Sequence, residues 1–430
     1  MIRLDIESLD NEGRGIARLD GKTMFVDGAI TGERVECSVY KKKPNYELAQ
    51  VHRVQRASPS RVAPGCAYFG VCGGCSMQHI DTRTQVAAKQ KVLEDCLARI
   101  GKVTAETLLA PVHGPAWRYR SRARLSVRLV RKKGGVLVGF HERRSSYVVD
   151  MVSCEVLPEF VSRALPDLRA LVGQLSFCDR LPQVELALGD RVSILVLRIL
   201  DQPNEADQAL LRDYAERSGF QLWLQSAGPE TATPFWPLDA APLDYELPEF
   251  DVRLRFNPTE FTQVNQEVNR MLVRRAMRLL DPRPGERIGD MFCGLGNFSL
   301  PIARSGAQVL GVEGSASMVE RAGENAALNG LSAQCRFMAA NLFKAEVCAR
   351  LESFDKLLID PPREGAMELV KSLEGREPRR IVYVSCDPAT LARDAEVLVH
   401  TMGYRMPAAG IVNMFPHTSH VESIALFERP

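Results

Sequence analysis

The sequence predicts a multidomain protein with an N-terminal OB-like β-barrel, a central α/β domain and a C-terminal Rossmann-like α/β domain. Three observations support this. Short apolar runs broken by turn residues fill the first 57 residues, cysteines and then arginines gather in the middle, and from about residue 256 apolar runs end repeatedly in a polar residue. A chain of 430 residues is long enough for several domains with cores of their own. From the changes in pattern we place the domain boundaries at 1–57, 58–255 and 256–430.

The composition is that of a globular protein, with 45% hydrophobic and 25% charged residues. No apolar run approaches the roughly 18 residues of a membrane span, and the residues after Met1 contain no hydrophobic signal core. We therefore expect a cytoplasmic protein without a membrane partner. In that setting eleven cysteines favour metal binding or catalysis over disulfides.

The net charge of +2 hides an uneven distribution of charge along the chain. Residues 117–147 contain ten Lys or Arg and one acid, whereas residues 150–260 contain nineteen acids, nine Arg and no Lys. A basic region of this kind favours contacts with nucleic-acid phosphates. The alternative is a solvated surface with counter-charges nearby.

The N-terminal barrel is predicted from its turns, at Gly15, Gly21, Gly28 and Gly32, which separate short apolar segments. OB-type barrels hold oligonucleotides on one sheet face and its loops. Basic residues for such contacts stand at Lys41–Lys43, Arg53 and Arg56. The pattern alone fits an accessory domain for another partner equally well.

A cysteine cluster follows the linker, with the spacing Cys66-x5-Cys72-x2-Cys75. Three thiolates this close in sequence suggest a metal or cluster site that lacks one ligand. Cys96 and Cys154 are the candidates for the fourth. We prefer Cys154, because Cys96 lies in an amphipathic helical pattern over 85–100, where a small core residue is expected. Zinc and an iron–sulfur cluster both accept four thiolates, so the spacing leaves the metal open.

An arginine-rich segment begins at Trp117 and alternates as a strand does. The alternation predicts a strand with a row of guanidinium groups on one face, which suits a nucleic-acid backbone. The candidate RNA-binding residues are Arg118, Arg120, Arg122 and Arg124.

The C-terminal region predicts a nucleoside site. Gly294-Leu-Gly296 follows a short strand, and the next strand ends in Glu313, an acid that could accept hydrogen bonds from ribose hydroxyls. Ser299 replaces the third glycine of the dinucleotide fingerprint. The absence of that phosphate-binding feature favours a nucleoside cofactor without phosphates, and S-adenosylmethionine fits.

Further strand ends should meet in the same cleft, because the carboxyl ends of parallel strands line one edge of the sheet. We expect this of Asp290, Asn341, Asp360 and Cys386, together with Glu313.

Cys386 is the predicted nucleophile. Asp387 can cap a following helix and Pro388 fits its first turn, so the thiol lies beside a helix N-terminus. The partial positive charge there would lower the pKa of the thiol. Glu422, which precedes the last apolar run, is the candidate base.

These motifs resemble those of the bacterial RNA uracil-C5 methyltransferases, in particular the iron–sulfur enzymes of the family that methylate a uridine of 23S ribosomal RNA. The resemblance covers nearly the whole chain. The matching stretches are 66–79, 117–124, 256–265, 290–298, 360–361, 385–394 and 415–422.

The resemblance implies an N-terminal TRAM barrel, a central domain with a [4Fe–4S] cluster and a methyltransferase domain, with part of residues 90–120 packed on the last. It implies transfer of a methyl group from S-adenosylmethionine to a uridine of 23S rRNA. Apart from the resemblance, we expect a monomer without an obligate protein partner. By residue, it implies cluster ligands at Cys66, Cys72, Cys75 and Cys154, a cofactor site at Gln263, Phe292, Asn297, Glu313, Asn341 and Asp360, and catalysis by Cys386, Glu422 and Asp360.

Other interpretations remain open from the sequence. The substrate could be another 23S uridine or the T-loop uridine of tRNA. A non-enzymatic RNA-binding protein with a zinc knuckle leaves Cys386, Asp360 and Glu422 unexplained. A radical enzyme that uses a cluster and S-adenosylmethionine usually has the spacing C-x3-C-x2-C, which differs from the spacing here.

Overall fold

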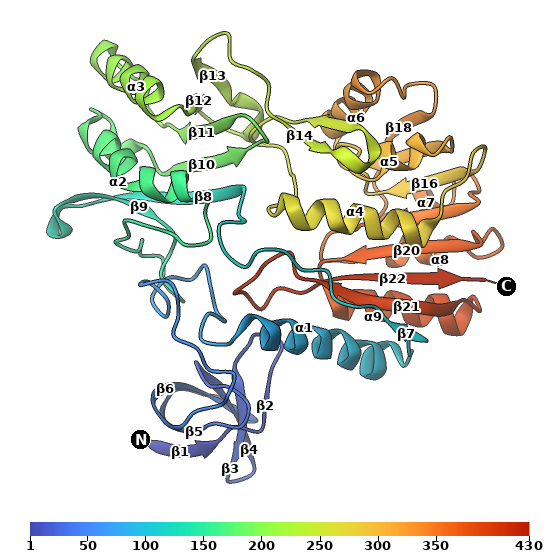
Figure 1. Ribbon diagram of the computed structural model, residues 1–430, viewed down its shortest axis with the longest axis horizontal. Coiled ribbons are helices and arrows are strands. Elements are labelled where there is room, and N and C mark those ends of the chain that lie inside the picture. Colours follow the sequence, from blue (N-terminus) through green and yellow to red (C-terminus); the bar gives the residue numbers. More distant parts are fainter. Residues whose placement is uncertain (430) are drawn as a thin grey trace.

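The computed structural model describes residues 1–429 and contains three bodies of secondary structure (Figure 1). The N-terminal strands form the lowest part of the view, the central sheet lies at the upper left, and the C-terminal sheet lies on the right. No helix within the described residues is long and apolar enough to cross a membrane.

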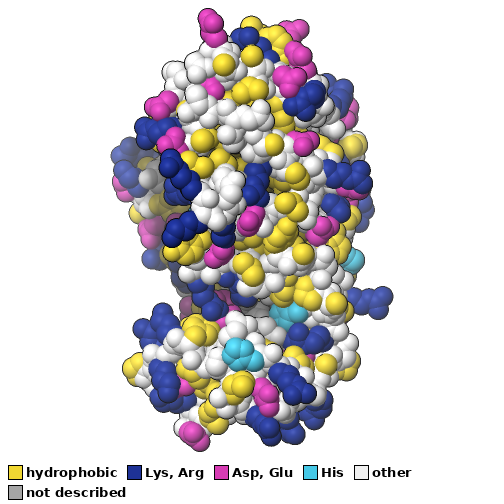
Figure 2. Space-filling view, turned by 90° about the vertical axis from the view of Figure 1, so that its left-hand side faces the viewer, with side chains coloured by type: hydrophobic (Ala, Val, Ile, Leu, Met, Phe, Trp, Pro, Cys, Tyr) yellow, Lys and Arg dark blue, Asp and Glu magenta, His cyan; other side chains and the backbone are white. Residues whose placement is uncertain are grey.

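The N-terminal barrel is a curled six-stranded sheet with the strand order β1-β5-β6-β4-β3-β2. Its small core contains Val26, Val35 and Ala49, all fully buried. Lys and Arg side chains are prominent on this lobe, the lower one in Figure 2. The strands are β1 (Ile2–Asp5), β2 (Ser8–Leu9), β3 (Gly15–Leu19), β4 (Lys22–Asp27), β5 (Arg34–Lys42) and β6 (Tyr46–Arg56).

Buried carboxylates fix the barrel to its neighbours. Asp27 is buried and accepts hydrogen bonds from the Tyr40 hydroxyl, 2.8 Å away, and from the Arg143 and Arg144 side chains of the central region. Glu33 is also buried and forms an ion pair with Arg61 of the linker. The barrel is therefore anchored to both the linker and the central region.

The central sheet has the order β13-β12-β11-β10-β8-β9, and two helices pack on it through residues such as Leu165, Leu168 and Leu211. Its elements are β8 (Arg122–Val130), β9 (Gly135–Gly139), α2 (Glu159–Gln174), β10 (Gln183–Leu188), β11 (Ser193–Arg198), α3 (Glu205–Ser218), β12 (Gln221–Gln225) and β13 (Thr233–Trp236).

The arginine-rich segment corrects one prediction, because its strand begins at Arg122 and not at Trp117. Arg118 has a φ of 61°, in the left-handed region. The backbone N–H groups of Arg118 and Arg120 donate to the carbonyls of Glu155 and Val156 rather than to a neighbouring strand.

The C-terminal sheet has eight strands in the order β18-β17-β16-β19-β20-β22-β21-β7. Neighbours from β18 to β20 run parallel, and β22 is antiparallel to both β20 and β21. Its elements are α4 (Gln266–Leu280), β16 (Arg287–Met291), α5 (Ser299–Arg304), β17 (Gln308–Glu313), α6 (Ala316–Leu328), β18 (Cys335–Ala339), α7 (Ala345–Cys348), β19 (Lys356–Ile359), α8 (Met367–Lys371), β20 (Arg380–Ser385), α9 (Pro388–Glu396), β21 (Arg405–Val412) and β22 (Glu422–Glu428).

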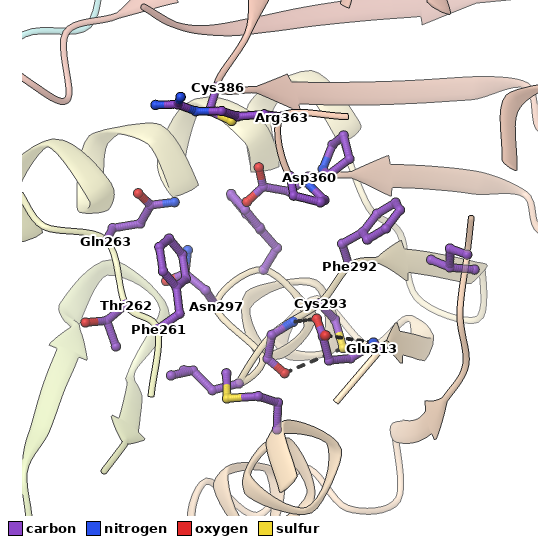
Figure 3. A pocket seen from close by; sticks show the side chains of 18 of the residues that line it. Phe261, Thr262, Gln263, Phe292, Cys293, Asn297, Glu313, Asp360, Arg363 and Cys386 are labelled. Atoms are coloured by element: carbon purple, nitrogen blue, oxygen red, sulfur yellow. Dashed lines mark hydrogen bonds between the residues drawn. The ribbon is translucent and has the colours of Figure 1, made fainter. Parts of the chain in front are cut away.

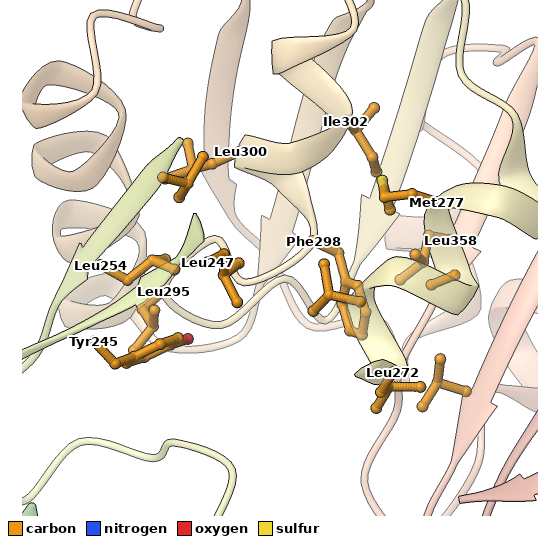
Figure 4. Close-up of a cluster of buried hydrophobic side chains, with 14 of the residues drawn as sticks. Tyr245, Leu247, Leu254, Leu272, Met277, Leu295, Phe298, Leu300, Ile302 and Leu358 are labelled. Atoms are coloured by element: carbon orange, nitrogen blue, oxygen red, sulfur yellow. The ribbon is translucent and has the colours of Figure 1, made fainter. Parts of the chain in front are cut away.

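Two segments that precede residue 256, 82–108 and 244–255, pack against or pair with the C-terminal sheet. Helix α1 (Thr82–Cys96) lies beside the sheet, with Leu93 in the same buried cluster as Leu391 of α9, and β7 (Thr107–Leu108) pairs with β21 (Figure 1). On the other face, the hairpin β14 (Asp244–Leu247) and β15 (Val252–Arg255) packs against α5 through Leu247 and Leu254 (Figure 4). The sequence boundary at 255/256 assigned this hairpin to the central domain. Its side chains share one buried cluster with Ala187, Ile194 and Val196 of the central sheet and with the C-terminal core.

Candidate active site

The turn after β16 shapes the first wall of the site. Gly294 and Gly296 have φ values of 55° and 97°, which residues with a Cβ rarely adopt. The N–H of Gly294 donates to Oε2 of Glu313 over 3.1 Å. The other carboxylate oxygen of Glu313 accepts from the N–H groups of Gly314 and Ser315. The glycine turn and the acid at the end of β17 are therefore held together.

A cavity of about 540 Å³ opens at the carboxyl ends of the parallel strands (Figure 3). Its lining includes every residue predicted as catalytic or cofactor-binding: Gln263, Phe292, Asn297, Glu313, Asn341, Asp360, Cys386 and Glu422. The expectation that Asp290 also faces the cleft was wrong. Asp290 is fully buried behind the wall, where it accepts a hydrogen bond from the Ser299 hydroxyl.

Asn297 is fixed by three hydrogen bonds. Its amide exchanges two 3.0 Å hydrogen bonds with the amide of Asn269 on α4, and its oxygen also accepts from the Tyr245 hydroxyl at 2.8 Å. Tyr245 belongs to the hairpin of β14 and β15. The hairpin and α4 therefore set the orientation of an amide in the cavity wall.

Cys386 directly follows β20, as predicted, and Asp387 caps α9 by accepting from the N–H of Ala389 at 2.9 Å. The predicted lowering of the thiol pKa was wrong. Burial, followed by the carboxylates of Glu422 and Asp360, raises the pKa of Cys386 to about 12, and Arg363 opposes them. The desolvation and the two acids outweigh the end of the helix, so the thiol is protonated near neutral pH in the unliganded protein.

Asp360 directly follows β19, and its environment favours the protonated acid. Burial, followed by the nearby carboxylates of Glu422 and Asp290, holds the pKa of Asp360 well above its usual range. A cavity wall that combines a thiol and two carboxyl groups in this way is suited to proton transfer.

Glu422 is the first residue of β22 and is buried. Nε2 of His420 lies 3.2 Å from its Oε1. The loop that leads to Glu422 is held by α1, because the Lys89 ammonium donates to Oδ1 of Asn413 at 2.7 Å and to the carbonyl of Phe415 at 2.8 Å. A helix from the first quarter of the chain thus positions an acid close to its C-terminus.

Further cavity-lining side chains escaped the sequence analysis. Arg363 and His420 stand within three residues of Asp360 and Glu422, so their proximity in sequence could have indicated them. Phe261 has 70% of its surface exposed and lines the cavity two residues before Gln263. Tyr245 carried no sequence signal, because it reaches the site only through the packing of the hairpin.

The four predicted RNA-binding arginines do not form one row. Arg122 donates its guanidinium hydrogens to the carbonyls of Pro258 and Glu260, the segment just before Gln263. Arg118 pairs with Glu155 at 2.9 Å, and Arg120 donates to the carbonyl of Arg122. Arg124 is paired with Glu185 but its side chain is 69% exposed. The guanidinium of Arg122 therefore stabilises the segment before Gln263, whereas the guanidinium of Arg124 remains accessible to RNA phosphates.

The thiols of Cys66, Cys72, Cys75 and Cys154 are neighbours. Burial, reinforced by the other three thiols, raises the pKa of Cys75 to about 12. Burial also raises the pKa of Cys154 to about 11, although the N–H groups of Val156 and Leu157 donate to its sulfur and oppose the shift. Within residues 1–429 no three His, Cys, Asp or Glu side chains are placed to hold a single metal ion.

Cys96, the other candidate for the fourth ligand, lies elsewhere. It stands at the end of α1, where burial and the carboxylates of Asp387 and Asp95 raise the pKa of its thiol. Its neighbourhood is therefore the start of α9 rather than the cysteine cluster.

The chain is similar to known proteins over nearly its whole length. The model of the tRNA (Uracil-5-)-methyltransferase family matches residues 81–430, and the TRAM domain model matches residues 1–52. A solved structure of Pyrococcus abyssi tRNA (uracil-54, C5)-methyltransferase in complex with S-adenosyl-L-homocysteine is similar over 99% of this chain and 100% of that one, with a TM-score of 0.77 and 25% identity.

Curated relatives are more similar in sequence. The 23S rRNA (uracil(1939)-C(5))-methyltransferase RlmD of Aromatoleum aromaticum is 61% identical over 427 residues and 99% of each chain. The protein of the same name from Thiobacillus denitrificans is 61% identical over 429 residues, again over 99% of each chain. The chain belongs to the tRNA (uracil-5-)-methyltransferase family and carries an N-terminal TRAM domain.

Proposed function

We propose that this protein transfers a methyl group from S-adenosylmethionine to C5 of a uridine in 23S ribosomal RNA. The observation that carries the proposal is the meeting of Cys386, Glu422 and Asp360 in one cavity with Glu313, the acid suited to ribose. Relatives at 61% identity over the full chain bear the name of that activity. A ribosomal RNA substrate implies a cytoplasmic enzyme, and no further protein partner is needed by a monomer that contains the whole cavity.

The chemistry requires a nucleophile, since uracil C5 does not take a methyl group from a sulfonium unaided. The Cys386 thiol first gives its proton to solvent, and addition of the resulting thiolate to C6 makes an enolate and renders C5 nucleophilic. C5 then takes the methyl group, Glu422 removes the C5 proton, and the C5–C6 double bond re-forms as Cys386 leaves. Asp360 orients the base or the cofactor amine. Holding the reactants together can be worth about 7–11 kcal/mol of the barrier.

The cofactor would occupy the wall formed by Gln263, Phe292, Asn297, Glu313, Asn341 and Asp360, all of which line the cavity. Glu313 already accepts backbone hydrogen bonds, and a carboxylate oxygen can accept more than one. Its free lone pairs suit two ribose hydroxyls, and the adjoining Phe292 ring offers an apolar surface to the adenine.

The RNA would lie across the barrel and the central region, with the target base turned out of its stack into the cavity. Extrusion costs a few kcal/mol, and less in a loop or a single strand. The exposed, ion-paired Arg118 and Arg124 are available for phosphate contacts, whereas Arg120 and Arg122 donate to carbonyls of the chain itself.

A [4Fe–4S] cluster on Cys66, Cys72, Cys75 and Cys154 fits the residues present. The four thiols lie close enough to raise the pKa of Cys75, and N–H groups donate to the sulfurs of Cys72 and Cys154, which stabilises thiolates. Four thiolates also suit zinc, and the resemblance to the iron–sulfur enzymes of the family is what favours the cluster. When bound, the cluster would tie the cysteine loop to the central domain.

A T-loop uridine of tRNA is the second candidate substrate, because the similar solved structure is of a tRNA (uracil-54, C5)-methyltransferase. The full-length relatives at 61% identity favour ribosomal RNA. Both substrates would undergo the same chemistry.

A denaturing gel tests the proposal. Protein and S-adenosylmethionine are incubated with 23S rRNA fragments that carry 5-fluorouridine, using wild type and Cys386→Ala. Fluorine at C5 blocks the final proton removal, so a covalent complex should persist with wild type and be absent with the variant. Mapping the complex identifies the uridine. A complex with tRNA alone would move the substrate, and no complex with any RNA would overturn the proposed reaction.

A further inference from the structure

The proposed reaction releases one proton per turnover, because the positive charge of the sulfonium disappears when the methyl group replaces hydrogen on C5. Glu422 receives this proton and has to lose it before the next cycle. The Glu422 side chain is only 8% exposed. A buried carboxyl group in this position needs a partner that passes its proton to water.

His420 lies where such a partner is needed. Its Nε2 is 3.2 Å from Oε1 of Glu422, and its side chain is 22% exposed and lines the same cavity. The ring packs edge-on against Phe415, with centroids 4.5 Å apart at 82°. Its backbone N–H donates to the Thr418 hydroxyl. The imidazole is therefore held between the buried acid and the surface.

The other charged or titratable groups that face Glu422 offer no exit. Asp360 and Cys386, at the ends of β19 and β20, are half-buried in the same wall, and their surroundings raise the pKa of both groups, so each keeps its own proton. Lys89 on α1 is 2% exposed, and its ammonium is occupied by Asn413 and Phe415. In the described part of the chain, His420 is the group that both hydrogen-bonds to Glu422 and reaches the surface.

We propose that His420 is the proton-relay residue of this site, an inference that rests on the proposed function. When Glu422 takes the C5 proton, the C–H electron pair re-forms the C5–C6 double bond and the Cys386 sulfur leaves as a thiolate with the electrons of its bond to C6. The thiolate regains from solvent the proton that it lost before the attack, so the C5 proton on Glu422 still has to leave. The proton then passes from Glu422 to Nε2 of His420, and the proton on Nδ1 leaves to water. Exchange at the two ring nitrogens restores the starting tautomer. Imidazole suits this task because it gains and loses protons near neutral pH.

Two substitutions separate relay from positioning. His420→Ala removes the ring and opens a space beside Glu422 that free imidazole can enter. His420→Gln keeps a side chain that can donate a hydrogen bond to Glu422 but cannot relay a proton. His400→Ala is the control, since His400 is exposed and bonds only to the carbonyl of Lys102.

The experiment follows the two halves of the reaction with the full-length protein. With 5-fluorouridine RNA, both His420 variants should form the covalent complex at the wild-type rate, because addition and methyl transfer precede the relay. With ordinary RNA, the methylated complex should accumulate and resolve about 10²-fold more slowly, the low end of what acid–base groups contribute. Added imidazole should restore resolution in His420→Ala and not in His420→Gln.

Each other outcome is decisive. Wild-type turnover in His420→Ala, or in His420→Gln, would overturn the relay. So would loss of the 5-fluorouridine complex in both variants, or slow resolution in His420→Ala that imidazole does not restore, because a structural role explains those results. Absence of the complex in wild type would instead reject the proposed function itself, whatever His420 does.

Discussion

The ammonium nitrogen of Lys89 lies 2.7 Å from the side-chain oxygen of Asn413, and the two residues come from opposite halves of the chain. Lys89 stands on α1, whereas Asn413 follows β21 and begins the loop that leads to Glu422. Burial lowers the pKa of Lys89 to about 7, with Glu422 opposing the shift. A nearly inaccessible lysine thus joins the central segment to the proposed base.

Lys89→Met should destabilise the protein, because it leaves the buried Asn413 side chain and the half-buried Phe415 carbonyl without their donor, at a cost of up to about 1–3 kcal/mol each. The loss should grow with pH. Between pH 7 and 10.5 the unfolded lysine binds a proton that the folded one does not, so the stability of wild type relative to the variant rises in this window. Melting temperatures of wild type and variant at pH 7 and pH 9 measure this difference in stability. Lys91→Met, an exposed position on the same helix, should show no widening, and a constant gap for Lys89→Met would contradict the argument.

The thiol of Cys386 gives a second pH dependence. Its pKa is raised to about 12, so without RNA the fraction of reactive thiolate should increase about tenfold per pH unit from pH 7 to 9. Alkylation by iodoacetamide, followed on the Cys386 peptide by mass spectrometry, should show this slope. Glu422→Gln removes a carboxylate that raises the pKa and should accelerate alkylation at fixed pH, whereas Arg363→Met should slow it. A plateau below pH 9 would show that the thiol ionises more easily than its surroundings indicate.

The C-terminal site was accessible to sequence reasoning because its residues follow a topological rule. The carboxyl ends of parallel strands meet at one edge, so Glu313, Asn341, Asp360 and Cys386 could be gathered into one cleft from strand ends alone. The same rule misplaced Asp290, which stands within β16 rather than after it, so that its side chain is buried behind the wall.

Features that depend on packing between distant segments could not be predicted. The hairpin that carries Tyr245 reads as two short strands of alternating charged and apolar residues, and nothing local shows which segments they pack against. Alternation suggested that Arg118 to Arg124 form one strand, but the left-handed backbone at Arg118 ends the pattern. The pKa of Cys386 was assigned the wrong direction because helix ends are visible in a sequence, whereas burial and the approach of Glu422 are not.

Arg124 and Arg122 lie on the same strand but differ in exposure, so each serves as the control for the other. Arg124→Ala should lower the salt dependence of RNA binding by about one unit of slope if its exposed guanidinium contacts a phosphate. Arg122→Ala should leave that slope unchanged and weaken S-adenosylmethionine binding, because Arg122 holds the segment before Gln263. Filter binding over a range of salt concentrations and calorimetry with the cofactor measure the two effects. A changed slope for Arg122→Ala would return it to the RNA surface.

The fourth cluster ligand can be identified by comparing two cysteines. Cys154→Ser should lose iron and inorganic sulfide after anaerobic purification, because the sulfur of Cys154 faces the other three thiols and receives the N–H groups of Val156 and Leu157. Cys96→Ser should keep the wild-type content, since the thiol of Cys96 lies near Asp387. Metal analysis of both variants and wild type for iron and zinc decides the matter. Zinc without sulfide in wild type would reject the cluster and keep the ligands, whereas loss of iron in Cys96→Ser alone would move the fourth ligand to α1. The same samples report on folding, because a cluster that ties the cysteine loop in place should make the melting temperature of Cys154→Ser lower than that of Cys96→Ser.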